Sequence, residues 1–397
     1  MRSAAGVRAT SVLVAGVLAT VLFVAALAFP PKASATALPP QLRVPLATAV
    51  TTPAGSWAVV AMGHLSDPLN TFWELFFLAP GASRWSLVTP PGVADNGGLV
   101  AGVPFFGPVA IGFEPSQQLH YSPLALSSDG GAHWTPALMP TALSAAPDAL
   151  AYEPAGPAVP GRALALVRTR GGQVLAGPAS LIGWAPLVSD RALMALAGRS
   201  CGIEGLDAVA FGPGGGPMVG TGCRRPGQVG IFTLQGGLWR QTGPTLSAPL
   251  AGSPTEMLRL DVSGSAITGL VADSNGAGSR LLAVWRHGGG SWSASAPLPI
   301  GPSQTLLSTA FGVGGELAVL VAGPGKNRTP EEVAPGRPWI RLPLLPPGTT
   351  TVAPMGNGSI DAFDVHGSHL RVYTLAAGAN TWISSQSMDV PIAYGSS

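Results

Sequence analysis

Residues 206–241 read LDAVAFGPGGGPMVGTGCRRPGQVGIFTLQGGLWRQ, and this stretch decides the fold. Short runs of small and β-branched apolar residues alternate with glycine-rich turns, a pattern typical of antiparallel strands. Strands that are covered on both faces lose the strict alternation of apolar and polar residues, which suits these runs. The stretch predicts one sheet of four strands, over 206–211, 217–222, 228–234 and 238–241, with turns at 212–216 and 235–237.

The composition of the whole chain agrees with a fold made of strands. The chain has 397 residues, of which 54 are Gly and 40 are Pro. In a helix interior each Gly costs about 1 kcal/mol and each Pro about 3 kcal/mol, which excludes a helical bundle. Disordered chains are poor in apolar residues, whereas 46% of this chain is hydrophobic. The net charge of +2 gives no basic field, so we expect no nucleic-acid partner.

Tryptophan recurs along the chain at intervals of 43 to 55 residues, in most cases just after a glycine-containing turn. Evenly spaced short strands with a repeated aromatic residue are the sequence sign of β-propeller blades. We therefore predict an all-β fold, a seven-bladed β-propeller of four-stranded antiparallel blades, with six or eight blades as the alternatives. The marker residues are Trp85, Trp134, Trp184, Trp239, Trp292, Trp339 and Trp382.

The N-terminus carries a targeting signal. An uncharged apolar run over residues 9–29 follows Arg2 and Arg8 and precedes two small-x-small triplets in residues 33–37. This order describes a secretory signal, and the run also approaches the roughly 20 residues that span a bilayer. We predict an N-terminal apolar helix in residues 1–37, either a cleaved signal peptide or a retained membrane anchor, followed by a β-propeller domain in residues 38–397. Either form leaves the propeller exported, extracellular or attached to the cell envelope.

The two cysteines of the chain, Cys201 and Cys223, are expected to form a disulfide in an exported protein. They flank the first two strands of the quoted stretch and are equidistant from Gly212, at the start of the predicted turn. Residues equidistant from a hairpin turn lie opposite each other, near the separation that a bridge needs. We predict that the bridge forms and contributes about 3 kcal/mol of stability.

Residues 127–134 read SSDGGAHW and fit the pattern Ser-x-Asp-x-Gly-x-x-Trp at Ser127, Asp129, Gly131 and Trp134. This stretch resembles the Asp-box, or BNR repeat, of sialidase-like β-propellers, in which the box is the turn between the third and fourth strands of a blade. Physically, a short Asp side chain accepts backbone N–H groups across its own turn, and Gly supplies positive φ. We expect the Trp to pack between sheets with its indole N–H bonded locally. The resemblance implies the fold and a structural role for these four residues; it does not imply activity, because the box lies away from the catalytic face.

A sialidase-type glycoside hydrolase is the alternative function. Residues 42–45, Leu-Arg-Val-Pro, are similar to the aromatic-Arg-Ile-Pro motif of that family, whose Arg binds the substrate carboxylate, but the aromatic residue is missing. A sialidase also needs two more Arg, an Asp acid/base and a Tyr–Glu pair. None of the four Tyr residues shows a spacing that pairs it with a Glu, so we assign no catalytic residue.

Charged residues gather on the predicted loops that join second and third strands. One arc carries His with carboxylates, including His366 and His369, and we assign no metal to it because side chains on separate loops seldom converge. The other arc is basic and, together with Arg43, is the candidate site for an anionic ligand. The alternative is that these charged side chains lie on hairpin turns only because the turns are exposed to solvent. The basic arc consists of Arg168, Arg170, Arg224, Arg225, Arg280, Lys326 and Arg328.

These observations predict an exported, non-catalytic β-propeller that acts as a binding or scaffold module at the bacterial cell envelope. The expected partner is an anionic glycan, a wall polymer or another envelope protein. We expect a monomer that needs no cofactor and meets the membrane through its N-terminal segment.

Overall fold

The computed structural model describes residues 42–45, 47–66, 70–90, 98–114, 123–138, 147–156, 160–168, 172–247, 253–275, 278–324 and 327–391. The chain divides into two units, Met1–Thr36 and Ala37–Ser397, and every described residue belongs to the second. The apolar helix predicted in residues 1–37 lies outside the described residues. Within them, no helix has the length and apolar character needed to cross a membrane.

Strands dominate the described residues and follow one another as antiparallel meanders. The first strands are β1 (Ala47–Thr52), β5 (Gly98–Gly102), β9 (Ala149–Glu153), β13 (Ile203–Phe211), β17 (Thr255–Ser263), β22 (Thr305–Phe311) and β26 (Thr349–Pro354). The second strands are β2 (Gly55–Gly63), β6 (Val109–Glu114), β10 (Arg162–Val167), β14 (Pro217–Cys223), β18 (Ala266–Asn275), β23 (Leu317–Ala322) and β27 (Ile360–His366). The third strands are β3 (Thr71–Leu78), β7 (Pro123–Ser127), β11 (Gln173–Pro178), β15 (Gly230–Gln235), β19 (Gly278–His287), β24 (Arg328–Val333) and β28 (His369–Leu375). The fourth strands are β4 (Ser86–Leu87), β8 (Thr135–Leu138), β12 (Ala185–Ser189), β16 (Leu238–Gln241), β20 (Ser293–Ala294), β25 (Ile340–Arg341) and β29 (Ile383–Asp389).

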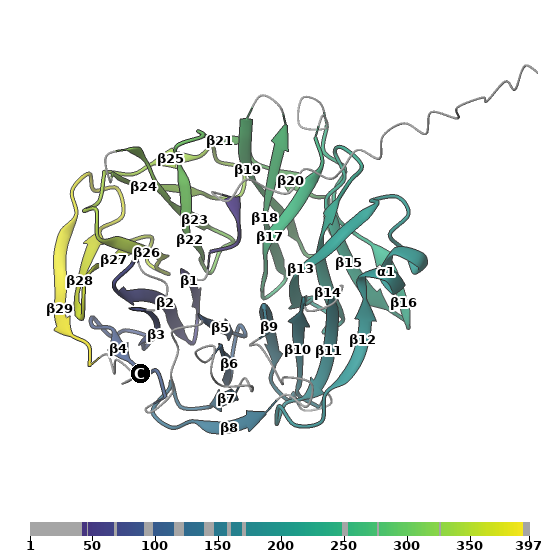
Figure 1. Cartoon of the computed structure of the whole chain (residues 1–397), viewed down its shortest axis with the longest axis horizontal. Coiled ribbons are helices and arrows are strands. Elements are labelled where there is room, and N and C mark those ends of the chain that lie inside the picture. The colour runs from purple at the N-terminus through teal and green to yellow at the C-terminus, as the bar shows by residue number, and fades with distance from the viewer. Residues whose placement is uncertain are drawn as a thin grey trace, which may run out of the picture. The chain divides into compact units, whose positions relative to one another are not determined.

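The first strands of the meanders are neighbours in space. β9 contacts β5 and β13, β13 contacts β17, and β26 contacts both β1 and β22. In the second unit the meanders succeed one another in chain order around these first strands (Figure 1). The all-β prediction is confirmed, and each meander is an antiparallel run of a first, second, third and fourth strand.

Three features depart from a uniform set of meanders. β14 pairs with β17 where Cys223 lies opposite Thr255, which joins these two meanders into one sheet of nine strands. β1 pairs with β22 in parallel, from Ala47 opposite Ser308 to Val50 opposite Phe311, so two meanders share one continuous sheet. In addition, the short strand β21 (Leu298–Ile300) pairs with β19. The prediction of purely antiparallel sheets is corrected by the β1–β22 pair, which joins strands from opposite parts of the chain and therefore leaves no local pattern.

Hydrophobic side chains pack between neighbouring meanders. Trp57 and Leu75 of the first meander, for example, share a buried cluster with Ile111 and Phe113 of the second. Each sheet is thus covered on both faces, which explains why its strands are apolar runs without alternation.

Five of the seven marker tryptophans donate the indole N–H to another meander, whereas Trp184 donates to Leu181 O of its own meander at 2.8 Å. Trp134 Nε1 donates to Val88 O at 2.8 Å, so the local bond expected for this indole was wrong. Trp85 Nε1, in the first meander, donates to Asp361 Oδ2 of the last meander at 2.8 Å. The same rule holds for Trp292, Trp339 and Trp382, which donate to Thr242 O at 2.6 Å, Ala296 O at 3.0 Å and Pro343 O at 2.9 Å.

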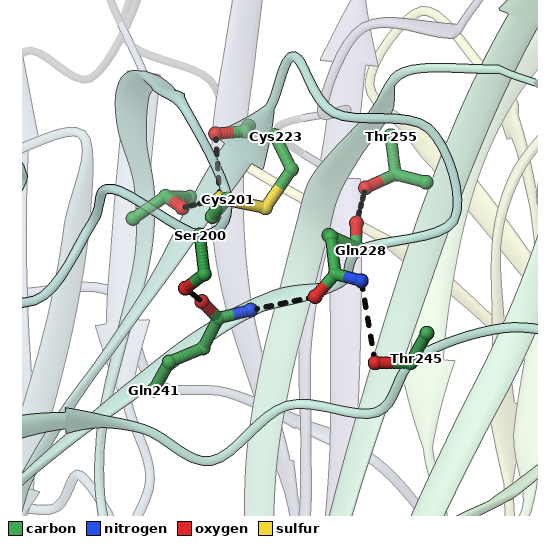
Figure 2. Close-up of a disulfide and its surroundings, with 9 residues drawn as sticks. Ser200, Cys201, Cys223, Gln228, Gln241, Thr245 and Thr255 are labelled. Carbon is green, nitrogen blue, oxygen red and sulfur yellow. Dashed lines mark hydrogen bonds between the residues drawn. A yellow bond between two sulfur atoms is a disulfide. The ribbon is translucent and has the colours of Figure 1, made fainter.

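The predicted disulfide between Cys201 and Cys223 is present, with the two Cα atoms 4.9 Å apart (Figure 2). Cys201 precedes β13, and the strand partner of Cys223 is Ile203. The predicted direct opposition of the two cysteines was therefore wrong, because register shifts between Ile203 and Gly205 and farther along β13 change the pairing. The bridge itself is confirmed.

One helix occurs among the described residues, α1 (Asp190–Leu196), between β12 and β13. Ser189 caps it by accepting a hydrogen bond from the backbone N–H of Ala192 at 3.2 Å, and Leu193 is buried against the sheets. The helix was not predicted, although a Ser-Asp pair before a run of Ala, Leu and Met is a helix-start signal.

Candidate functional site

A cavity of about 290 Å³ opens among the first strands, at the end where they turn into the second strands. β1, β5, β9, β13 and β17 line it, together with the turns that follow β5, β9, β13 and β17. We call it the hairpin-end cavity. Ligand pockets usually measure about 300–1,000 Å³, so this cavity has room for a small ligand.

Two charged residues of β17 line the hairpin-end cavity, Arg259 and Asp261. Leu260 between them packs in a hydrophobic cluster between two meanders, and strand alternation therefore places both charged side chains on the opposite face. Both are half-buried. Burial lowers the pKa of Arg259 and raises the pKa of Asp261 to about 6, although the guanidinium and the Val262 N–H oppose the second shift.

The Arg259 guanidinium makes no hydrogen bond or ion pair with any residue that the structure describes. A guanidinium has five N–H donors and cannot lose its charge in a protein. An arginine that is half-buried without a partner is costly, because desolvation of its charge is uncompensated. Its donors are therefore available to a ligand.

Aromatic residues form another part of the cavity wall. Phe105 and Phe106 follow β5, and their rings meet edge to face with centroids 4.6 Å apart. Phe106 is 58% exposed to solvent. Tyr152 and Phe211 contribute buried rings. The cavity thus combines apolar faces with a few polar groups, the usual make-up of a small-molecule site.

The remaining carboxylate of the cavity wall, Glu153, already has a partner. Arg162 Nε donates to Glu153 Oε2 at 3.1 Å, and the Arg162 guanidinium lies over the Phe211 ring at 5.1 Å from its centroid. Arg162 also donates to the carbonyl of Gly215, in the β13–β14 turn. This pair is neutral overall. Arg259 and Asp261 are the charged residues of the cavity wall without an ion-pair contact to a described residue, although their opposite charges attract each other.

A second, smaller cavity of about 60 Å³ lies at the other end of the first strands, where Asp148 and Asp207 line it. Arg259 lines both cavities, which are therefore neighbours along β17. Arg168 lies 3.9 Å from Asp148 Oδ1 and 3.9 Å from Asp207 Oδ1. The pKa of Asp207 is raised to about 7, first by burial and then by the negative charge of Glu256, while Arg168 opposes the shift. The Oδ2 atom of Asp207 is buried and has no hydrogen-bond partner among the described residues.

The arginines of the predicted basic arc lie at or near the junctions of second and third strands, but most have protein partners. Arg224 Nε donates to Glu204 Oε1 at 2.6 Å, and Arg280 donates to both oxygens of the fully buried Asp273 at 2.8 and 2.6 Å. Arg328 donates to the carbonyl of Thr349, and Arg168 is held as described above. Arg225 is exposed, and Arg170 and Lys326 lie outside the described residues. The arc is therefore largely neutralised, and its role in ligand binding stays a prediction.

The predicted histidine arc also separates into local pairs. His366 Nε2 lies 3.1 Å from Asp364 Oδ2, and His369 Nδ1 lies 2.9 Å from Asp389 Oδ1. The described residues contain no group of three or more His, Cys, Asp or Glu that could hold a metal ion.

The turn at Ser127–Trp134 lies between β7 and β8, the third and fourth strands of their meander, as expected. Ser127 Oγ accepts the Gly131 N–H at 2.8 Å, and Asp129 Oδ1 accepts the His133 N–H at 2.9 Å. The hydrogen bond from the His133 backbone N–H, followed by the one between the His133 ring and the carboxylate, lowers the pKa of Asp129 to about 2. The turn therefore organises backbone and packs against the preceding meander, which is a structural role.

Among the described residues, which exclude Tyr121 and Tyr394, those that the alternative hydrolase needs do not come together. Arg43 is exposed before β1, and its positive charge helps to lower the pKa of Glu256, which burial raises. The hydroxyl of Tyr152 donates to Ala179 O at 3.3 Å, and that of Tyr373 accepts from Arg371 at 3.2 Å. No Tyr–Glu contact occurs within the part of the chain that the structure describes.

The sequence analysis missed Arg259 and Asp261. Their position inside a first strand was a weak signal, in a chain with only 10% charged residues. The same strand also carries Glu256, and the first strand β13 likewise carries two acidic residues, Glu204 and Asp207.

Comparison with known proteins supports the fold. No model of a known protein family matches the chain, and no curated protein matches it. Among solved structures, the BP39L lectin of Burkholderia pseudomallei is 16% identical with a TM-score of 0.50, over 86% of this chain and 99% of the lectin. A protein from Lactobacillus plantarum is 11% identical with a TM-score of 0.52, over 85% of this chain and 97% of that one. A puromycin-hydrolysing peptidase of Mycobacterium tuberculosis is 14% identical with a TM-score of 0.49, over 86% of this chain and 52% of the peptidase.

At these identities, likeness to the lectin and to the Lactobacillus protein concerns the fold alone. Together with the successive four-stranded meanders, it identifies the described residues as a β-propeller.

Proposed function

We propose that this protein is an exported, non-catalytic β-propeller at the bacterial cell envelope that binds a glycan in the hairpin-end cavity. One observation carries the proposal: the cavity combines exposed aromatic surface at Phe106 with the unpartnered guanidinium of Arg259. Aromatic rings cover the C–H faces of sugars through apolar contact, and charged side chains fix the orientation of polar substituents.

The proposal includes a closed ring of seven blades. Its support is the indole of Trp85, which reaches from the first meander to Asp361 of the last, as the indoles of four other marker tryptophans reach from a meander to its predecessor. Gln386 adds to this contact, since its side chain accepts the Trp85 N–H and donates to the Trp85 carbonyl, both at 2.8 Å.

Membership among Asp-box repeat proteins also belongs to the proposal. The hydrogen bonds of Ser127 and Asp129 to backbone N–H groups of their own turn support it. A structural box is compatible with a protein that binds without catalysis, and no observation favours the hydrolase, because neither described Tyr contacts a Glu.

A glycan array tests the proposal. The purified protein and its Phe106→Ala variant are compared with Leu238→Ala, a matched control in which an apolar side chain that is 60% exposed is removed from β16, outside the cavity. We expect glycan signals that Phe106→Ala weakens about tenfold or more, which corresponds to about 1.4 kcal/mol, and that Leu238→Ala preserves. Absence of glycan signal, or equal effects of the two variants, would contradict the proposed function.

A further inference from the structure

The charges of the hairpin-end cavity set a requirement for its ligand. Glu153 is neutralised by Arg162, whereas Arg259 lacks a protein partner. Asp261 lies two residues further along the same strand and also lines the cavity. The two opposite charges attract each other, but among the described residues they form no ion-pair contact. The cavity therefore offers a set of planar donors beside a carboxylate that accepts hydrogen bonds.

A guanidinium binds best to a planar anion that accepts two parallel hydrogen bonds, and a carboxylate is such an anion. Asp261 is suited to hydroxyl donors next to that carboxylate. The rings of Phe105 and Phe106 are suited to the C–H face of a saturated ring. One ligand class unites these features: a pyranose with a carboxylate on the ring and free hydroxyl groups.

We propose that the glycan residue held in the hairpin-end cavity is a uronic acid, with its carboxylate on Arg259 and its hydroxyl groups directed to Asp261. This inference rests on the proposed function. The volume of about 290 Å³ is at the lower end of ligand pockets, which favours a single sugar ring over a longer chain. Further sugars of a polymer would extend past Phe106, whose exposed ring stands at the edge of the cavity.

Isothermal titration calorimetry with sodium glucuronate, sodium galacturonate and glucose tests this inference. Glucose is the neutral counterpart, because it differs from glucuronate at the carboxylate. We expect a uronate to bind at least about tenfold more tightly than glucose, because its carboxylate makes one charge-assisted bidentate contact with the guanidinium. Glycine is included because a small zwitterion could also meet an arginine and an aspartate; glycine binding at the uronate's affinity would overturn the inference.

Variants locate the contact. Arg259→Gln should weaken uronate binding about tenfold or more and leave glucose binding unchanged, and Arg259→Lys should give an intermediate loss, since it keeps the charge without the planar fork. Arg240→Gln is the matched control: it removes one exposed arginine of β16, outside the cavity and outside the predicted basic arc, and should change nothing. Since Arg259 has no protein partner, Arg259→Gln should fold with an unchanged or raised melting temperature, and the Lys variant provides a second test if it does not.

The outcomes separate the two proposals. Sugar binding that Phe106→Ala abolishes but Arg259→Gln does not affect would overturn the uronic acid and keep the glycan site. Uronate binding that is lost in Arg240→Gln, or kept in Arg259→Gln, would also overturn it. Absence of any sugar binding in either experiment would contradict the proposed function itself.

Discussion

Replacement of Trp85 by Phe tests how the last meander is joined to the first. The indole N–H donates to Asp361, a carboxylate that is 7% exposed and whose pKa burial raises, while its hydrogen bonds with Thr374 and Trp85 oppose that shift. Hydrogen bonds to charged groups contribute about 1.5–3 kcal/mol, and the void left by the smaller ring adds about 1 kcal/mol. We therefore expect Trp85→Phe to lower the free energy of unfolding by about 2.5–4 kcal/mol.

Trp184→Phe is the matched control. Trp184 is as well buried as Trp85, at 8% against 3% exposed, but its indole donates to the neutral carbonyl of Leu181 within its own meander. Neutral hydrogen bonds contribute about 1 kcal/mol, so this variant should lose about 2 kcal/mol. Both free energies come from urea denaturation followed by tryptophan fluorescence and circular dichroism.

The two variants should also differ in their pH dependence. The Trp85 indole favours the charged form of Asp361, so its loss raises the folded-state pKa of that carboxyl further. The additional destabilisation is therefore present above that pKa and is lost as the pH falls through it. Equal losses for Trp85→Phe and Trp184→Phe, or a Trp85→Phe loss that grows on acidification, would refute the reasoning about this junction.

Three further predictions concern the stability of the fold. Gly131→Ala should destabilise the protein by about 1–3 kcal/mol in urea titrations, because φ is +87° there and a Cβ atom would lie 2.5 Å from Val88 Cβ; unchanged stability would contradict this packing. Reduction of the Cys201–Cys223 bridge by dithiothreitol should cost about 3 kcal/mol, and a Cys-free double Ser variant should show no response to the reductant. Asp207→Asn should raise the melting temperature at pH 8 relative to the wild type and have little effect near pH 4. Because the folded-state pKa of Asp207 is raised, the stability that its protonated carboxyl contributes is present below the unfolded-state pKa and is lost as the pH rises through about 7. Equal effects of Asp207→Asn at both pH values would contradict this assignment.

Much of the fold could be predicted from the sequence because its determinants are local. The four strands of residues 203–241 and their turns match the expected ranges within a few residues, since glycine-rich turns interrupt apolar runs there. The parallel pair of β1 and β22 could not be predicted, because it depends on how distant meanders meet. The shifts that place Ile203 opposite Cys223 are likewise set by the packing of the sheet and leave no mark in the spacing of the cysteines.

The candidate site was harder to predict than the fold. Sequence reasoning placed ligand binding on loop arginines, where charge is easy to find, but the structure pairs Arg224 with Glu204 and Arg280 with Asp273. Only the structure shows that Arg259 is half-buried and lacks such a partner. Whether a charge is compensated is a property of the tertiary fold, and for this reason the spacing of charged residues could not reveal it.

A crystal structure of the protein with the strongest glycan of the array tests the central claim most directly. We expect the sugar in the hairpin-end cavity, with an acidic group on the Arg259 guanidinium and a ring face against Phe105 or Phe106. A glycan seated elsewhere, for example between the outer strands of two meanders with the cavity unoccupied, would contradict it.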